Sequence, residues 1–138
     1  MAKRGWIDVH YHAMNEPYRE ALSHIGGIIR TPKWSRREAL EFSERRDIGT
    51  GILSLGVPGA HLGDNAKARQ LARRCNEDLA DFIAQHPLRF GQFALTSMPD
   101  IEGACVEAAY ALDTLKADGI ILLSSYDGQS VGQPQWDP

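Results

Sequence analysis

The sequence has 138 residues, of which 43% are apolar and 24% charged, and this suits one globular domain with a buried core. The formal net charge is −3, and acidic and basic residues are mixed along the sequence. This distribution excludes a basic surface for binding nucleic acid and a cationic face for binding a membrane. No run approaches the roughly 18 apolar residues of a membrane span, and no signal-peptide pattern follows the N-terminus. We therefore expect a cytoplasmic protein.

Four short apolar runs have the length and composition of buried strands. They cover residues 6–10, 51–55, 90–95 and 119–123. Helical patterns separate them, so the strands cannot form hairpins and must be parallel neighbours joined by crossovers. This order leaves two fold classes open, a doubly wound open sheet and a (β/α) barrel.

The helices between these strands carry clear start and stop signals. A first short helix is predicted over residues 17–23, and residues 26–34 have the composition of a loop. The capping box that begins at Ser35 predicts a helix to about residue 46. A third helix should begin at a cap on Asp64 or Asn65 and end before Pro87.

The fourth helix should begin at Asp100 and close at Asp118-Gly119. Its apolar stripe includes Cys105, as the stripe of the third helix includes Cys75. We expect both thiols to be packed in the core, with a disulfide as the alternative.

The pair His10 and His12 ends the first predicted strand. Side chains alternate along a strand, so the two imidazoles should point the same way, with Cα atoms roughly 6–7 Å apart. Such a pair can hold one metal ion, although two surface histidines at a strand end have the same spacing. The carboxyl end of a buried parallel strand is where active sites of these folds are built, which favours the metal site. Residues 7, 9 and 11 should point outward under helices.

Several longer runs resemble one branch of the amidohydrolase superfamily, that of aminocarboxymuconate-semialdehyde decarboxylase. The first-strand run Ile7-Asp8-Val9-His10-Tyr11-His12 resembles the superfamily signature. Runs that resemble the branch are residues 31–35, 40–42, 52–59, 72–77, 86–91 and 111–115. The resemblance extends from about Trp6 to about Leu123.

This resemblance implies a (β/α)₈ barrel with a divalent metal, zinc being our expectation, and His10 and His12 as its first two ligands. The family takes a third histidine ligand, a catalytic histidine and an aspartate ligand from its fifth, sixth and eighth strands. None of these lies in this sequence, so we expect residues 1–138 to be the N-terminal part of one barrel domain, truncated after four β/α units. Four parallel strands alone leave two open edges, and for this reason a homo-oligomer is also predicted.

The implied activity is a metal-dependent, nonoxidative decarboxylase acting on a small aromatic or muconate-like carboxylic acid. A metal-dependent hydrolase of an ester, lactone or amide is the alternative among enzymes, and an inactive half-barrel that pairs with another chain is the alternative of another class. Arg30 could bind a substrate carboxylate through two parallel hydrogen bonds. Trp34 could line the substrate pocket or pack at the start of the following helix. His61, after the second strand, lies on the catalytic side and is a further candidate for substrate binding.

Overall fold

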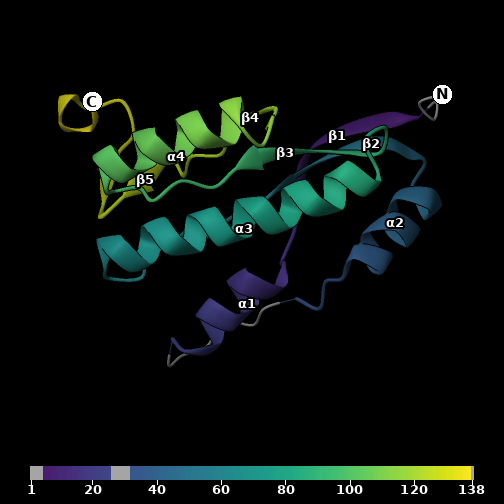
Figure 1. Cartoon of the computed structure of the whole chain (residues 1–138), viewed down its shortest axis with the longest axis horizontal. Helices are drawn as coiled ribbons and strands as arrows, with labels where there is room; N and C mark the ends of the chain where they lie inside the picture. The colour runs from purple at the N-terminus through teal and green to yellow at the C-terminus, as the bar shows by residue number, and fades with distance from the viewer. Residues whose placement is uncertain (1–4, 26–31, 138) are drawn as a thin grey trace.

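The computed structural model describes residues 5–25 and 32–137, and Figure 1 shows the whole chain. In chain order the elements are β1 (Trp6–His12), α1 (Glu16–Ser23), α2 (Arg36–Arg45), β2 (Ile48–Ser54), α3 (Asn65–Gln85), β3 (Phe90–Ala94), α4 (Ile101–Asp113), β4 (Gly119–Ile120), β5 (Ser125–Tyr126), β6 (Gln129–Ser130) and a short 3₁₀ helix (Pro134–Trp136). Among the described residues, no helix is both long enough and apolar enough to cross a membrane.

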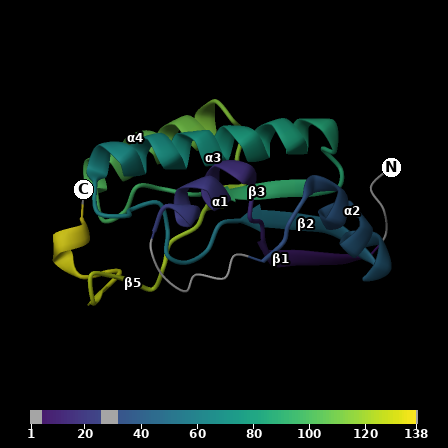
Figure 2. The same cartoon turned by 90° about the horizontal axis from the view of Figure 1, so that it is seen from below.

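The four main strands form one parallel sheet in the order β1-β2-β3-β4. Figure 2 shows α3 and α4 along the same side of this sheet, where α3 packs against β3 and α4. Because consecutive strands are neighbours and the sheet curls, the structure is the first half of a (β/α)₈ barrel, as predicted. The open doubly wound alternative, which needs helices on both faces, does not describe it.

The main core lies between the sheet and helices α1, α2 and α3, and a smaller apolar cluster is formed by Met98, Ala104 and Tyr126. The largest fully buried apolar side chains of the main core are those of Tyr18, Leu53, Leu55, Leu79 and Phe82. Because α1 contributes to the same core as β2 and α3, the short helix after β1 is fixed to the body of the half-barrel.

The predicted helix starts are confirmed by their caps. The side chains of Ser35, Asp64 and Asp100 each accept a hydrogen bond from the backbone N–H three residues later, at 3.2, 2.8 and 3.3 Å. The predicted end of α4 is wrong, because the helix stops at Asp113. Lys116 has φ 58°, a left-handed conformation that a continuing helix does not contain.

The predicted buried face of α4 is also wrong, because the residues that face the core each lie one position before those of the predicted apolar stripe. Cys105 is exposed, whereas Cys75 is buried as predicted, and both thiols are free. The face of α4 turned to the core carries Ala104, Glu107 and Ala111. The apolar stripe did not include Glu107, because a buried carboxylate is tolerated only when it is paired.

Glu107 is paired on both sides by α3. Its carboxylate accepts hydrogen bonds from Nε of Arg73 and Nδ2 of Asn76, each at 2.8 Å. Asn76 also donates to the carbonyl oxygen of Leu95 and accepts from its N–H, again at 2.8 Å. These contacts join α3, α4 and the end of β3, so this stretch of α3 supports the fold.

The predicted burial of β1 is wrong for two residues. Ile7 and Val9 are 69% and 59% exposed, and only Tyr11 is covered, with its hydroxyl donating to the carbonyl oxygen of Ala39 in α2. The reason is that β1 is an edge strand of the described sheet and α2 packs on β2.

The region after α4 differs most from expectation. Strand β4 has two residues instead of the predicted five, since β3 pairs with it only at Gly119 and Ile120. A small antiparallel hairpin of β5 and β6 follows, which was not predicted from the sequence. Its turn is Asp127-Gly128, with φ 50° and 76°, a dipeptide strongly typical of hairpins.

Candidate metal centre

His10 and His12 lie together at the carboxyl end of β1. Their Nε2 atoms are 2.9 Å apart, and the two rings meet edge to face with centroids separated by 4.7 Å. Both side chains are exposed. The two imidazoles therefore converge on one point outside the sheet, which is the arrangement that a shared ligand requires.

A register irregularity in β1 lies directly beneath this pair. Asp8 pairs with Gly51 and Tyr11 with Leu53, so β1 has one residue more than β2 over this stretch. The carboxylate of Asp8 accepts the backbone N–H of His10 at 3.0 Å. Such a bulge changes the direction of the side chains around it, and the aspartate satisfies an N–H in the irregular segment.

The separation of the two Nε2 atoms suits a shared ion. Nitrogens bound to one zinc ion at about 2.0–2.1 Å, with roughly 90–110° between the bonds, lie about 3 Å apart. Without an ion, a contact of this length requires that one Nε2 carry the proton and the other accept it. The donor set thus fits a divalent metal with little rearrangement of the two rings.

Two histidines alone make an incomplete metal site. Among the described residues there is no group of three or more His, Cys, Asp or Glu side chains that could hold an ion. Catalytic zinc usually has three protein ligands and an open position. The described residues therefore offer two candidate ligands of such a site, His10 and His12.

A small apolar hollow adjoins the second histidine. It has a volume of about 190 Å³ and is lined by His12, Ala13, Met14, Pro32, Gly56 and Val57. Because this lining is mainly apolar and one wall is an imidazole, the hollow can accept the edge of a flat apolar group next to a metal ion. We call it the His12 hollow.

The turn after β2 forms the far side of the His12 hollow. The imidazole of His12 lies beside Gly56, since a Cβ added at residue 56 would be 3.0 Å from Cε1. Tyr18 of α1 is fully buried behind this turn and hydrogen-bonds to Gly56 and Gly59. Burial raises the pKa of the Tyr18 hydroxyl to about 12, so it keeps its proton.

Tyr18 and Gly56 were not among the residues predicted for the site. The only available signal was position: Gly56 follows the second strand directly, beside the end of the first. For Tyr18 the sequence offers no such signal, because its partners Gly56 and Gly59 lie about 40 residues further along the chain.

The residues predicted to bind substrate lie elsewhere or outside the described residues. Arg30 is in the part of the chain that is not described. Trp34 packs edge to face on Phe82, with ring centroids 6.3 Å apart, which is the packing role that the sequence also allowed. Nε2 of His61 lies 2.9 Å from Oδ1 of Asn65 at the start of α3. Neither Trp34 nor His61 lines the His12 hollow, and their role toward a substrate stays a prediction.

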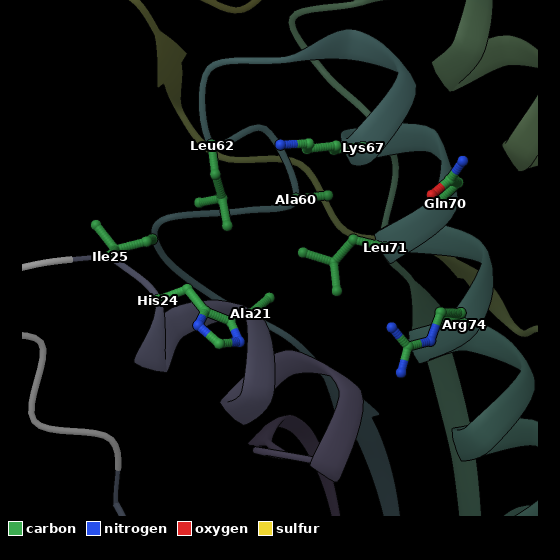
Figure 3. Close-up of a pocket in the computed structure, with 9 residues that line it drawn as sticks. All are labelled: Ala21, His24, Ile25, Ala60, Leu62, Lys67, Gln70, Leu71 and Arg74. Atoms are coloured by element: carbon green, nitrogen blue, oxygen red, sulfur yellow. The ribbon is translucent and has the colours of Figure 1, made fainter.

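A larger hollow of about 450 Å³ lies between α1, the segment after β2 and the first turns of α3 (Figure 3). Its lining includes the apolar side chains of Ile25 and Leu71 and the basic side chains of Lys67 and Arg74. Arg74 already pairs with Glu20 at 2.9 Å. Neither His10 nor His12 is among the residues that line this hollow, so it is separate from the candidate metal centre.

Comparisons with known proteins place this geometry in a family. A crystal structure of an amidohydrolase II protein matches 95% of this chain with a TM-score of 0.88 and 31% identity. The chain belongs to the amidohydrolase superfamily. No family model matches it.

Decarboxylases are among the amidohydrolase-superfamily proteins most similar to the chain. The 6-methylsalicylic acid decarboxylase of Aspergillus aculeatus is 38% identical over 125 residues, covering 87% of this chain and 38% of that protein. A dihydroxybenzoic acid decarboxylase structure from a Polaromonas species, with bound manganese and the inhibitor 2-nitroresorcinol, matches 84% of this chain and 37% of that chain. Its TM-score is 0.65 at 28% identity.

The amidohydrolase half-barrel thus spans less than half of the proteins it matches. Two 6-methylsalicylic acid decarboxylases, from Aspergillus aculeatus and Penicillium expansum, are covered over 38% and 44% of their length. The amidohydrolase II structure is likewise covered over 44% of its chain.

Proposed function

We propose that this half-barrel belongs to a metal-dependent decarboxylase of a small aromatic carboxylic acid, in which His10 and His12 are two ligands of one divalent metal ion. The observation that carries the proposal is the pair of Nε2 atoms 2.9 Å apart at the carboxyl end of β1. The similarity to decarboxylases of 6-methylsalicylic and dihydroxybenzoic acids supports the reaction type. The activity is proposed for the whole barrel, since two histidines do not complete a catalytic metal site.

The residues described here would hold the metal and one side of the substrate. A divalent ion, when bound, supplies electrostatic stabilisation of the charge that develops on substrate oxygens as the carboxylate leaves. His10 and His12 must both present unprotonated Nε2 atoms to it. Met14 and Val57 of the His12 hollow offer an apolar wall for an aromatic ring.

The identity of the metal is part of the proposal. Zinc is the ion predicted from the sequence, whereas the dihydroxybenzoic acid decarboxylase structure contains manganese. Imidazole binds both ions, so the two histidines do not discriminate between them. Both should be tested in the same assay.

The first experiment measures metal content. The intact protein is purified, loaded with Mn²⁺ or Zn²⁺, freed of excess ion and analysed by mass spectrometry for metal per chain. We expect about one ion per chain in the wild type and a loss in His10→Ala and His12→Ala. His24→Ala removes another exposed imidazole at the end of α1 and is the matched control. Equal metal content in His12→Ala and wild type would contradict the proposal.

The second experiment tests the reaction. The metal-loaded protein is incubated with 6-methylsalicylate or 2,6-dihydroxybenzoate carrying a ¹³C-labelled carboxyl group. Labelled carbon dioxide together with the corresponding phenol supports decarboxylation. Release of an acid from a lactone, with no carbon dioxide from either substrate, would instead support the hydrolase alternative.

A further inference from the structure

The ring of His12 rests on a backbone turn that is held from behind by a buried tyrosine. We propose that Tyr18 is a positioning residue for His12: its hydroxyl fixes the turn Gly56–Gly59, and Gly56 in turn determines where the imidazole lies. The purpose of this positioning rests on the proposed metal role of His12, while the positioning itself does not.

The first step is the link between Tyr18 and the turn. The Tyr18 hydroxyl lies 2.9 Å from the carbonyl oxygen of Gly56 and 3.3 Å from that of Gly59, and it accepts the N–H of Gly59 at 3.0 Å. A phenol has one hydrogen, so it donates to the nearer oxygen, that of Gly56. Gly59 has φ +86°, a conformation suited to glycine. The hydrogen bonds of the Tyr18 hydroxyl with Gly56 and Gly59 therefore fix the turn at both ends.

The second step is the rigidity of the base that carries Tyr18. Asn15, the residue that precedes α1, is fully buried and donates from Nδ2 to the carbonyl oxygen of Cys75 and to Asp78, each at 3.0 Å. These bonds fix the start of α1 to the middle of α3. The hydroxyl of Tyr18 therefore acts from a helix that cannot move independently of the core.

The third step is the contact between Gly56 and His12. A Cβ at residue 56 would lie 3.0 Å from Cε1 and 3.2 Å from Nδ1 of His12, so the ring occupies the space beside Gly56 that a side chain at this position would need. Metal-binding histidines usually fix their orientation by donating the second ring nitrogen to an acceptor. Among residues 5–25 and 32–137, no hydrogen bond to Nδ1 of His12 is found. Packing on Gly56 supplies the constraint that such a bond would otherwise provide.

The experiment compares Tyr18→Phe with Tyr126→Phe in the intact protein. Tyr126 is also buried and its hydroxyl also accepts a backbone N–H, that of Leu123 at 3.0 Å, so the control removes a buried hydroxyl that is not hydrogen-bonded to the turn Gly56–Gly59. The first readout is the ¹⁵N imidazole spectrum of the metal-free protein. We expect the His12 signals to shift or broaden in Tyr18→Phe, while those of His86 stay unchanged.

The second readout is Mn²⁺ affinity, measured by competition with a chelating dye. We expect Tyr18→Phe to weaken binding about threefold to tenfold, less than the roughly 10–100-fold effect of a direct hydrogen-bond partner of a ligand. Gly56→Ala leaves Tyr18 in place and places a methyl group against the His12 ring. It should therefore give the same spectral change and a larger loss of affinity, and it provides the test if Tyr18→Phe folds poorly.

The outcomes separate this inference from the proposed function. If Tyr18→Phe and Gly56→Ala leave the His12 signals as they are in Tyr126→Phe, the positioning role is overturned, whatever metal the protein binds. If both variants move the His12 signals while the wild type binds no divalent ion, the positioning role stands and the proposed metal site fails.

Discussion

Replacing Asn76 with alanine tests the link that holds α3, α4 and the end of β3 together. The Asn76 side chain is completely buried and makes three hydrogen bonds of 2.8 Å, two with the backbone of Leu95 and one with Glu107. Each contributes about 1 kcal/mol net, and the partners left behind have no access to water. We expect the free energy of unfolding to fall by about 3 kcal/mol, equivalent to a drop in Tm of about 10 °C for a chain of this length.

The assay is urea unfolding followed by circular dichroism, with the midpoint and the slope m fitted separately. The matched control is Asn65→Ala, an exposed amide on the same helix with one hydrogen-bonding contact, to His61. It should change the free energy of unfolding by less than about 0.5 kcal/mol. If the two variants differ by less than about 1 kcal/mol at equal m, the buried amide does not hold these elements together and the reasoning is refuted.

Three further predictions concern residues of α3, α4 and the cap of α4. Asp100 caps α4 and pairs with Arg69 at 2.6 Å, and this guanidinium lowers the pKa of the carboxyl. Its stabilisation of the fold is complete above the pKa of an unfolded aspartate, about 3.9, and is lost as pH falls through the lower pKa of the folded state. Asp100→Asn should therefore be less stable than wild type at pH 7, and this difference should shrink as pH is lowered below about 3.9. The free energy of unfolding should be about 1 kcal/mol lower in Asp100→Ala than in Asp100→Asn, because an asparagine side chain can still cap the helix. Equal free energies of unfolding for the two variants in chemical denaturation would contradict this. In native protein, iodoacetamide should label exposed Cys105 and spare Cys75, whose burial raises the pKa of its thiol; peptide mass spectrometry showing equal labelling would refute the assignment.

The order of strands and helices could be predicted from the sequence because each signal is local. The caps at Ser35, Asp64 and Asp100 need only a side chain and a backbone N–H three residues later. The convergence of His10 and His12 likewise follows from two-residue alternation at a strand end. Both features depend on neighbours in the chain and were therefore visible without coordinates.

What could not be predicted depends on partners distant in sequence. Glu107 faces the core only because Arg73 and Asn76, on another helix, satisfy its carboxylate. As a result Glu107 lies on the buried face of α4 and Cys105 is exposed. Gly56 lies beside His12 only because β1 and β2 are neighbours in register. Periodicity within one element carries no information on such pairs.

Strand β1 carries both histidines, yet within the described part of the chain it is hydrogen-bonded on one side only, to β2. Its side chains Trp6, Ile7 and Val9 are 75%, 69% and 59% exposed. In a closed barrel every strand is flanked on both sides, so closure would cover these residues and restrain the backbone that carries the imidazoles. On the proposed metal role of His10 and His12, affinity for a divalent ion should therefore rise when the barrel closes, and a chelator titration would follow that assembly.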